Sequence, residues 1–158
     1  MVLERKENYV ELRMIGLGRM IAHMVQRLIR AGHECVVCDL RSEAVQAFAK
    51  DGAVGTSSLE DFANKLKNPH AIWMMVPAAE DDPTLNILIP LLQRDGVVID
   101  GGNSYYHNDI RRAVELKPKG VHYVDVGDSS GVWGSERGSC LMIGGHEEKD
   151  ANTRGFAR

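Results

Sequence analysis

Apolar runs alternate with segments of helical period along almost the whole chain. Nearly continuous apolar side chains, typical of buried strands, occupy residues 10–15, 34–39, 71–76, 97–100 and 121–126. After the first run, Met20, Met24 and Leu28 recur every four residues, a stripe predicted to face a sheet. The alternation predicts an α/β fold, a Rossmann-like doubly wound and mainly parallel sheet with helices on both faces.

Turn and cap residues set the expected ends of these elements. Gly16 and Gly18 turn the chain after the first strand, and Gly32 ends the helix that follows. Helices are also expected at residues 42–52, 59–66 and 105–116 and from residue 81 onward, with short strands at 53–55 and 140–145. We therefore predict a dinucleotide-binding Rossmann domain over residues 10–145, an N-terminal extension over 1–9 and a polar tail over 146–158.

Composition narrows the class of protein. The chain has 158 residues, of which 44% are hydrophobic and 26% charged, with a net charge of -3. These values are typical of one soluble globular domain and do not favour a nucleic-acid partner. The first nine residues are too polar for a signal peptide, and no apolar run is long enough to span a bilayer, so we expect a cytoplasmic protein without membrane contact.

The cysteines and histidines give little sign of redox or metal chemistry. Cys35 and Cys38 have C-x-x-C spacing, but residues three apart on a strand point to opposite faces, which favours two small buried side chains. Cys140 makes the set odd, so no disulfide framework is expected. The histidines are scattered, and we predict no metal site.

The first two strands end in residues that suit a dinucleotide. In "GLGRMI", the glycines permit a tight turn that brings backbone N–H groups close to a pyrophosphate at a helix N-terminus. Asp39, 23 positions after Gly16, is placed to bind ribose hydroxyls and to repel a 2'-phosphate. These residues predict NAD as cofactor, with NADP possible because Arg41 could instead accept the phosphate.

Later strands end in groups that suit a sugar acid and a nicotinamide. Gly101 and Gly102 in "IDGGNS" would let the backbone approach a ligand, and Asn103 offers both donors and acceptors. The loop "GDSSGVWG" supplies hydroxyls and flexible backbone for an anion. An ordinary turn or loop would also use these residues, so each signal is ambiguous alone.

A series of strings carries a resemblance to a known family. "MIGLGRM", "AGHECVVCDL", "MVPAA" and "VVIDGGNSYY" are followed by "DIRRA", "HYVDVG", "GVWG", "ERG" and "CLMIGG". In this order they resemble the N-terminal domain of decarboxylating 6-phosphogluconate dehydrogenases. The wider β-hydroxyacid dehydrogenase group shares the glycine-rich turn but lacks "IDGGNS" and "GVWG".

The resemblance implies oxidation of 6-phosphogluconate at carbon three by hydride transfer to the nicotinamide, then loss of carbon dioxide to give ribulose 5-phosphate in the pentose phosphate pathway. The implied cofactor contacts are Gly16, Leu17, Gly18, Arg19, Met20, Asp39, Leu40, Arg41, Val76, Pro77, Ala78 and Asn103. The implied substrate contacts are Asn103, Ser129, Ser130 and Gly131. The sequence "CDL" resembles that of the NAD-preferring branch.

The chain departs from the family pattern at several places. Ile21 stands where the family has the third glycine of its turn, so we expect it to push the helix outward or crowd the pyrophosphate and to weaken cofactor binding. Ser130 replaces a glycine, and Asp128 replaces a threonine beside a site meant for an anion. The family's general acid/base lysine belongs to a helical domain beyond the matched region, so no catalytic residue is assigned here.

Three functional readings follow from these observations. The first is the dinucleotide-binding half of a 6-phosphogluconate dehydrogenase, inactive or weakly active as this short chain. The second is a non-catalytic dinucleotide-binding or interaction module derived from that family, and the third is a dehydrogenase of a smaller β-hydroxyacid. Self-association through the surface that would face the helical domain is a further expectation.

Overall fold

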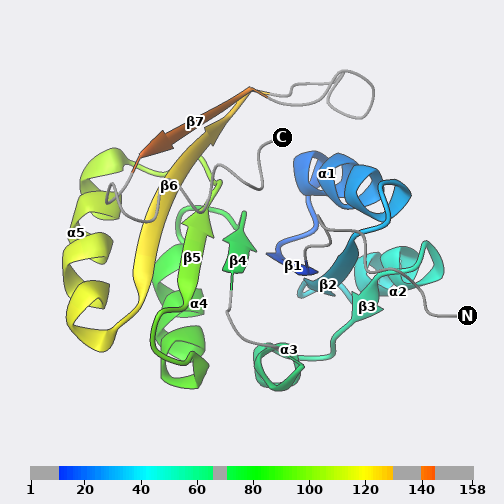
Figure 1. Ribbon diagram of the computed structural model, residues 1–158, viewed down its shortest axis with the longest axis horizontal. Coiled ribbons are helices and arrows are strands. Elements are labelled where there is room, and N and C mark those ends of the chain that lie inside the picture. The colour runs from blue at the N-terminus through cyan, green and yellow to red at the C-terminus, as the bar shows by residue number, and fades with distance from the viewer. Residues whose placement is uncertain (1–10, 66–70, 130–139, 145–158) are drawn as a thin grey trace, which may run out of the picture.

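The computed structural model describes residues 11–65, 71–129 and 140–144 (Figure 1). Within these ranges one seven-stranded sheet has the order β3-β2-β1-β4-β5-β6-β7. Its strands are β1 (Glu11–Ile15), β2 (Glu34–Cys38), β3 (Val54–Gly55), β4 (Ala71–Met74), β5 (Val97–Asp100), β6 (His122–Asp128) and β7 (Leu141–Gly144). All pairs are parallel except β6 with β7. The expected 1–9 extension and 146–158 tail lie outside the described residues.

Helices cover both faces of the sheet, as the alternation predicts. They are α1 (Arg19–Arg30), α2 (Ser42–Lys50), α3 (Leu59–Asn64), α4 (Asp81–Leu88) and α5 (Tyr106–Leu116), with 3-10 turns η1 (Ile89–Leu91) and η2 (Lys117–Lys119). One core contains side chains of α1 and α2, and a second contains side chains of α3, α4 and α5. The prediction of a doubly wound, mainly parallel fold is confirmed.

The two cores separate alternate residues of each strand. In β2, Cys35 belongs to the core under α1 and α2, whereas Cys38 belongs to the core under α3, α4 and α5. The two thiols therefore lie on opposite faces of the sheet, as a strand requires of residues three apart. Both cysteines are free and buried, which confirms the prediction of two small buried side chains.

The buried face of α1 differs from the predicted stripe. Ile21 and Val25 are the buried residues of this helix, with exposed fractions of 1% and 0%. Met24 and Leu28 pack only partly against the same core, and Met20 is 36% exposed. In α1, which begins at Arg19, the face that meets the sheet contains Ile21 and, one turn later, Val25. Met20 lies to one side of this face.

Strand β6 runs two residues further than the predicted 121–126. Its last residues pair with the antiparallel edge strand β7, with Gly127 opposite Met142 and Asp128 opposite Leu141. Partnership with β7, a long-range contact, extends the strand into the glycine-containing segment predicted as loop. Among the described helices, none combines the length and the apolar character needed to cross a bilayer.

Candidate functional site

The turn after β1 requires glycine at its first position. Gly16 has a φ of +87°, and a Cβ built there would lie 2.3 Å from the carbonyl oxygen of Met75. Its N–H donates to the carbonyl of Cys38 at 2.9 Å, which ties the turn to the end of β2. Any side chain at this position would collide with backbone, so the turn is fixed by packing as well as by conformation.

The N-terminus of α1 is open. Gly18 is its N-cap, and a Cβ added there would meet nothing within 4 Å. No side chain caps the helix, and its first turn contains no acidic residue. Arg19 and Met20 are exposed beside Gly18. Unpaired amides at the positive end of a 12-residue helix form a site that suits an anion such as pyrophosphate.

Asp39 joins this turn to the end of β2. Its Oδ2 accepts the N–H of Leu17 at 2.5 Å, and its Oδ1 accepts the N–H of Arg41 at 2.8 Å. Burial raises the pKa of Asp39, but the hydrogen bonds from Arg41 and Leu17 together outweigh it and hold the pKa below its ordinary value. The carboxylate is therefore charged beside the open helix end.

Arg41 is paired with that carboxylate. Its Nε lies 3.2 Å from Oδ1 of Asp39, and its Nη2 donates to the carbonyl oxygen of Leu17 at 3.1 Å. The acid that would favour NAD and the base that would favour NADP thus form one ion pair, with the Arg41 side chain 64% exposed. Leu40, between them, is 98% exposed, whereas the side chain of Leu17 is buried in the core.

The end of β4 adjoins the same turn. The N–H of Met75 donates to the carbonyl of Ile15 at 2.9 Å, and a Cβ on Gly16 would lie 3.2 Å from Cγ1 of Val76. Pro77 and Ala78 follow as exposed residues. The sheet order reverses between β1 and β4, which is where ligands bind in open α/β sheets. The structure therefore brings the predicted contacts after β1, β2 and β4 to one edge.

The glycine pair after β5 has a packing role. A Cβ on Gly101 would lie 2.4 Å from Nε1 of the buried Trp73, and the N–H of Gly102 donates to Oδ1 of Asp100 at 2.8 Å. The sequence suggested that these glycines bring the backbone close to a ligand, whereas the structure shows Gly101 making room for an indole. Asn103 follows as an exposed residue at the same sheet edge.

The predicted substrate contacts after β6 are only partly described. Ser129 is exposed, and its N–H donates to the carbonyl of Cys140 at 3.1 Å, beside β7. Ser130 and Gly131 lie outside the described residues. Asp128, the residue in place of threonine, is half-buried at the end of β6 opposite Leu141. Because β5 and β6 are neighbours, Asn103 and Ser129 follow adjacent strand ends.

Ile21 faces the sheet. Its side chain is 1% exposed and packs in the core with Met14, Leu17 and Val25. The side chain therefore acts on the contact between helix and sheet, the first of the two expected effects. It leaves the exposed Gly18 and Arg19, where the pyrophosphate was expected, uncovered. The effect of Ile21 on cofactor affinity stays a prediction.

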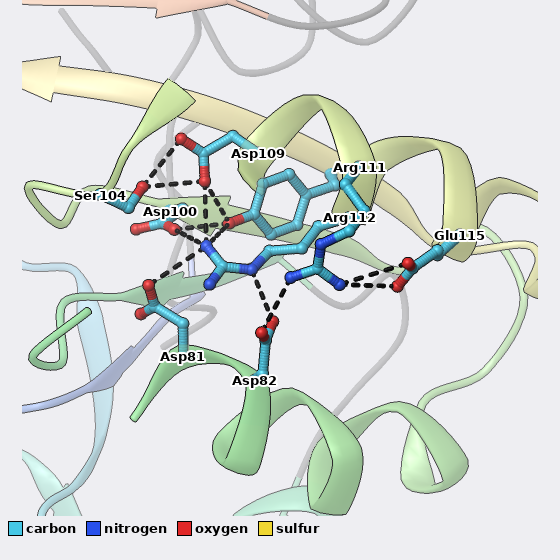
Figure 2. Close-up of polar contacts among 9 residues, drawn as sticks. Asp81, Asp82, Asp100, Ser104, Asp109, Arg111, Arg112 and Glu115 are labelled. Carbon is cyan, nitrogen blue, oxygen red and sulfur yellow. Dashed lines mark hydrogen bonds and ion pairs between the residues drawn. The ribbon is translucent and has the colours of Figure 1, made fainter. Parts of the chain in front are cut away.

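A buried polar cluster lies beside the sheet edge that carries the predicted ligand contacts, between β5, β6, α4 and α5 (Figure 2). At its centre is Arg112, whose Nη1 lies 3.0 Å from Asp109 and 3.1 Å from Asp81. The Nε of Arg112 donates to Asp82 at 2.8 Å, and Asp100 lies 3.6 Å away. The exposed fractions of Asp81, Asp100, Asp109 and Arg112 are between 0% and 5%.

The cluster contains more acid than one guanidinium neutralises. Burial and, after it, the charge of Asp100 raise the pKa of Asp81 to about 6, against the opposing effect of Arg112. Burial and the nearby Asp100 also raise the pKa of Tyr123, so its hydroxyl stays protonated and donates to Asp100. Among the described residues, no group of three histidine, cysteine or acidic side chains is arranged to hold a metal ion.

This cluster was not predicted from the sequence. The sequence predicts a helix from residue 81 onward, and the structure places Asp81 in the first turn of α4 but also in contact with Arg112. The available signal was the spacing of Asp109, Arg112 and Leu116, which puts an acid and a base on the buried face of one helix.

Comparison with known proteins agrees with this geometry. Residues 11–155 match the family model described as the NAD binding domain of 6-phosphogluconate dehydrogenase. The NAD(+)-dependent decarboxylating 6-phosphogluconate dehydrogenase of Haloferax volcanii is 44% identical over 137 residues, which are 86% of this chain and 45% of that enzyme. The chain thus spans under half the length of this relative.

Two solved structures share the fold. A Plasmodium falciparum 6-phosphogluconate dehydrogenase superimposes with a TM-score of 0.80 at 24% identity, over 93% of this chain and 33% of that one. A 3-hydroxyisobutyrate dehydrogenase of Mycobacterium tuberculosis superimposes with a TM-score of 0.85 at 20% identity, over 94% and 51%. At these identities the likeness concerns the fold alone.

Proposed function

This chain belongs to the family of NAD-binding domains of 6-phosphogluconate dehydrogenase, and on that premise we propose that its turn after β1 holds the pyrophosphate of NAD. The observation that carries the proposal is the open N-terminus of α1, where Gly18 leaves room and no side chain occupies the first-turn amides. Gly16 keeps that turn tight, and the exposed Arg19 adds positive charge. The residues present fit the cofactor.

Asp39 sets the preference for NAD over NADP in this proposal. Its carboxylate is charged, and its oxygens face the turn through the N–H of Leu17. A 2'-phosphate placed here would meet that charge, and Arg41 offsets the repulsion only by leaving its ion pair with Asp39. We therefore expect NADP to bind more weakly than NAD, with Leu40 available to contact the adenine side of the cofactor.

We propose that the sugar acid 6-phosphogluconate binds beyond β5 and β6. Asn103 would hydrogen-bond both the substrate hydroxyls and the nicotinamide amide, and Ser129, Ser130 and Gly131 would bind the acid. Bound NAD would supply the hydride acceptor at this edge. The residues of this chain would orient the carbon that carries the hydride toward it.

Proton transfer is a step to which none of the described residues is assigned. The family's general acid/base lysine belongs to the helical domain outside the matched region, so we expect NAD binding without appreciable turnover. A non-catalytic dinucleotide-binding module is the second candidate. The observation that favours it is Ile21, which stands in place of the third glycine of the family's turn and packs in the hydrophobic core.

The test is binding and turnover measured on the same preparation. Quenching of tryptophan fluorescence on titration gives the affinity for each dinucleotide, and absorbance at the reduced nicotinamide band follows oxidation of 6-phosphogluconate. We expect saturable NAD binding with no measurable turnover. Turnover of 3-hydroxyisobutyrate in place of 6-phosphogluconate would contradict the substrate assignment, and failure of the folded chain to bind either dinucleotide would contradict the cofactor assignment.

A further inference from the structure

Asn103 sits on a short segment that is held at both sides by buried carboxylates. On one side, the N–H of Gly102 donates to Oδ1 of Asp100 at 2.8 Å. On the other, the hydroxyl of Ser104 lies 2.8 Å from each oxygen of Asp109. Asn103 itself is exposed at the sheet edge. Buried carboxylates thus hold the residues on both sides of Asn103, while the Asn103 side chain faces solvent.

The two carboxylates belong to one rigid network (Figure 2). Tyr123 donates to Oδ2 of Asp100 at 2.5 Å, and its hydroxyl lies 3.2 Å from Asp109. Arg112 reaches both acids, at 3.0 Å from Asp109 and 3.6 Å from Asp100. All of these side chains are buried, so the network has few alternative arrangements and water does not compete with its hydrogen bonds.

Ser104 connects this network to the segment that carries Asn103, and a substitution of its side chain can remove this connection. Its hydroxyl is the only group that Ser104 contributes to the contacts drawn in Figure 2, and those contacts go to Asp109 alone. Asp109 keeps its ion pair with Arg112 whether or not the hydroxyl is present. Loss of the hydroxyl would therefore loosen the segment after Asn103 and leave the charges of the cluster paired.

We propose that Ser104 is a positioning residue, which holds Asn103 in its ligand-binding orientation through the buried Asp109–Arg112 pair. The proposal rests on the function proposed above, in which Asn103 contacts the nicotinamide and the sugar acid. In this view Ser104 touches neither ligand. It fixes the backbone from which Asn103 reaches them, so that ligand binding does not have to order this segment.

The experiment compares Ser104→Ala and Ser104→Thr with the wild type, in the chain as given. Amide hydrogen exchange over residues 101–104 reports the order of the segment without any ligand, and NAD titration reports binding. We expect Ser104→Ala to exchange about fivefold faster and to bind NAD about fivefold more weakly, the effect of one hydrogen bond. Ser104→Thr keeps the hydroxyl and should behave as the wild type.

Three further variants, Ser58→Ala, Asn103→Ala and the double variant of Asn103→Ala with Ser104→Ala, separate positioning from general stability. Ser58→Ala removes a hydroxyl that caps α3 and lies outside the cluster, so its exchange at residues 101–104 should be unchanged. If Ser104 acts through Asn103, Ser104→Ala should weaken NAD binding no further when Asn103 is already alanine. An additive loss in the double variant, or unchanged exchange in Ser104→Ala, would overturn the proposal.

The two readouts also separate this proposal from the proposed function. If the folded wild type binds no dinucleotide, the proposed function fails, and the role of Ser104 as a determinant of ligand binding fails with it, even where exchange shows that the segment has loosened. If the wild type binds NAD and Asn103→Ala weakens binding but Ser104→Ala does not, the proposed function stands and the positioning role is overturned.

Discussion

The N–H of Leu17 donates to the carboxylate of Asp39 across 2.5 Å, which links the glycine turn after β1 to the end of β2. This acid therefore stabilises the turn, and in the proposed function it also places negative charge where the cofactor ribose would lie. Arg41, paired with the same carboxylate, adjusts the charge that a ligand meets.

Asp39→Asn tests the cofactor preference. The amide keeps a similar shape and one acceptor but loses the charge that repels a 2'-phosphate and leaves Arg41 without its ion-pair partner. We expect the ratio of the NADP Kd to the NAD Kd to fall about tenfold, which corresponds to about 1.4 kcal/mol. Competition titrations with both dinucleotides measure the ratio. An unchanged ratio would mean that Asp39 does not face the ribose.

The glycines of the turn should fail in different ways. Gly16→Ala forces a Cβ against the Met75 carbonyl at a positive φ, so we expect a loss of about 2 kcal/mol or more in the free energy of unfolding. Gly18→Ala has free space and an ordinary φ, so its loss should stay within about 1 kcal/mol.

Although Gly18→Ala should affect stability little, we expect it to weaken NAD binding strongly. The added methyl group occupies the space over the open helix end, and we expect NAD to bind at least about tenfold more weakly to Gly18→Ala. Urea denaturation and NAD titration on the same samples separate the two effects. Wild-type affinity in a folded Gly18→Ala variant would exclude the α1 N-terminus as the pyrophosphate site.

Asp81 should make stability depend on pH. Burial raises its pKa from 3.8 to about 6, so the folded state holds a proton that the unfolded state has released between these values. Its contribution is favourable at low pH and is lost as the pH rises from about 4 to about 6. Asp81→Asn lacks this dependence, while Asp82, Asp100 and Asp109 still face Arg112.

Urea denaturation of the wild type and Asp81→Asn at pH 4.5 and pH 8 measures this effect. Between these values, we expect the variant to gain about 2 kcal/mol relative to the wild type, from the shift in the Asp81 pKa. Parallel pH dependences would show that Asp81 is ionised in the folded state at both values and acts only as an ion-pair partner of Arg112.

The thiols should differ sharply in reactivity. Burial raises the pKa of Cys35 to about 11 and also raises that of Cys38, whereas Cys140 is exposed. At pH 7.5 we expect one thiol to react rapidly with a disulfide reagent and the others at least about a hundredfold more slowly. Rapid reaction of all three, or a disulfide between Cys35 and Cys38 in the folded protein, would contradict their placement on opposite sheet faces.

The sequence predicted those parts of the fold that depend on local pattern. Nearly continuous apolar runs gave the parallel strands, and the glycine turn with Asp39 gave the ends of β1 and β2 that the structure brings together. These features are visible in sequence because a buried strand needs apolar residues on both faces and a turn at positive φ needs glycine.

Features that depend on long-range contact were not predictable in the same way. The ion pair of Arg41 with Asp39, the packing of Gly101 against Trp73 and the extension of β6 by β7 each depend on residues that only the tertiary structure brings together. The cluster around Arg112 joins residues of α4, α5, β5 and β6, and only its Asp109–Arg112 part has a helical spacing that the sequence displays. The order of residues along the chain does not show which distant residues meet in such a network.

Ile21 bears on the proposal that the turn after β1 binds NAD. Its side chain lies in the core, so Ile21→Ala should lower the free energy of unfolding by about 3 kcal/mol through the cavity it leaves. If the isoleucine does not reach the pyrophosphate, the folded variant should bind NAD as the wild type does.

Calorimetric titration of NAD into the wild type, with Ile21→Ala beside it, is the most direct test of that proposal. We predict saturable binding of one NAD per chain, with Kd values that agree within about threefold between the two proteins. Absence of binding to the folded wild type would contradict the proposal, whether Ile21→Ala restores binding, which would show that the isoleucine disables the turn, or leaves it absent.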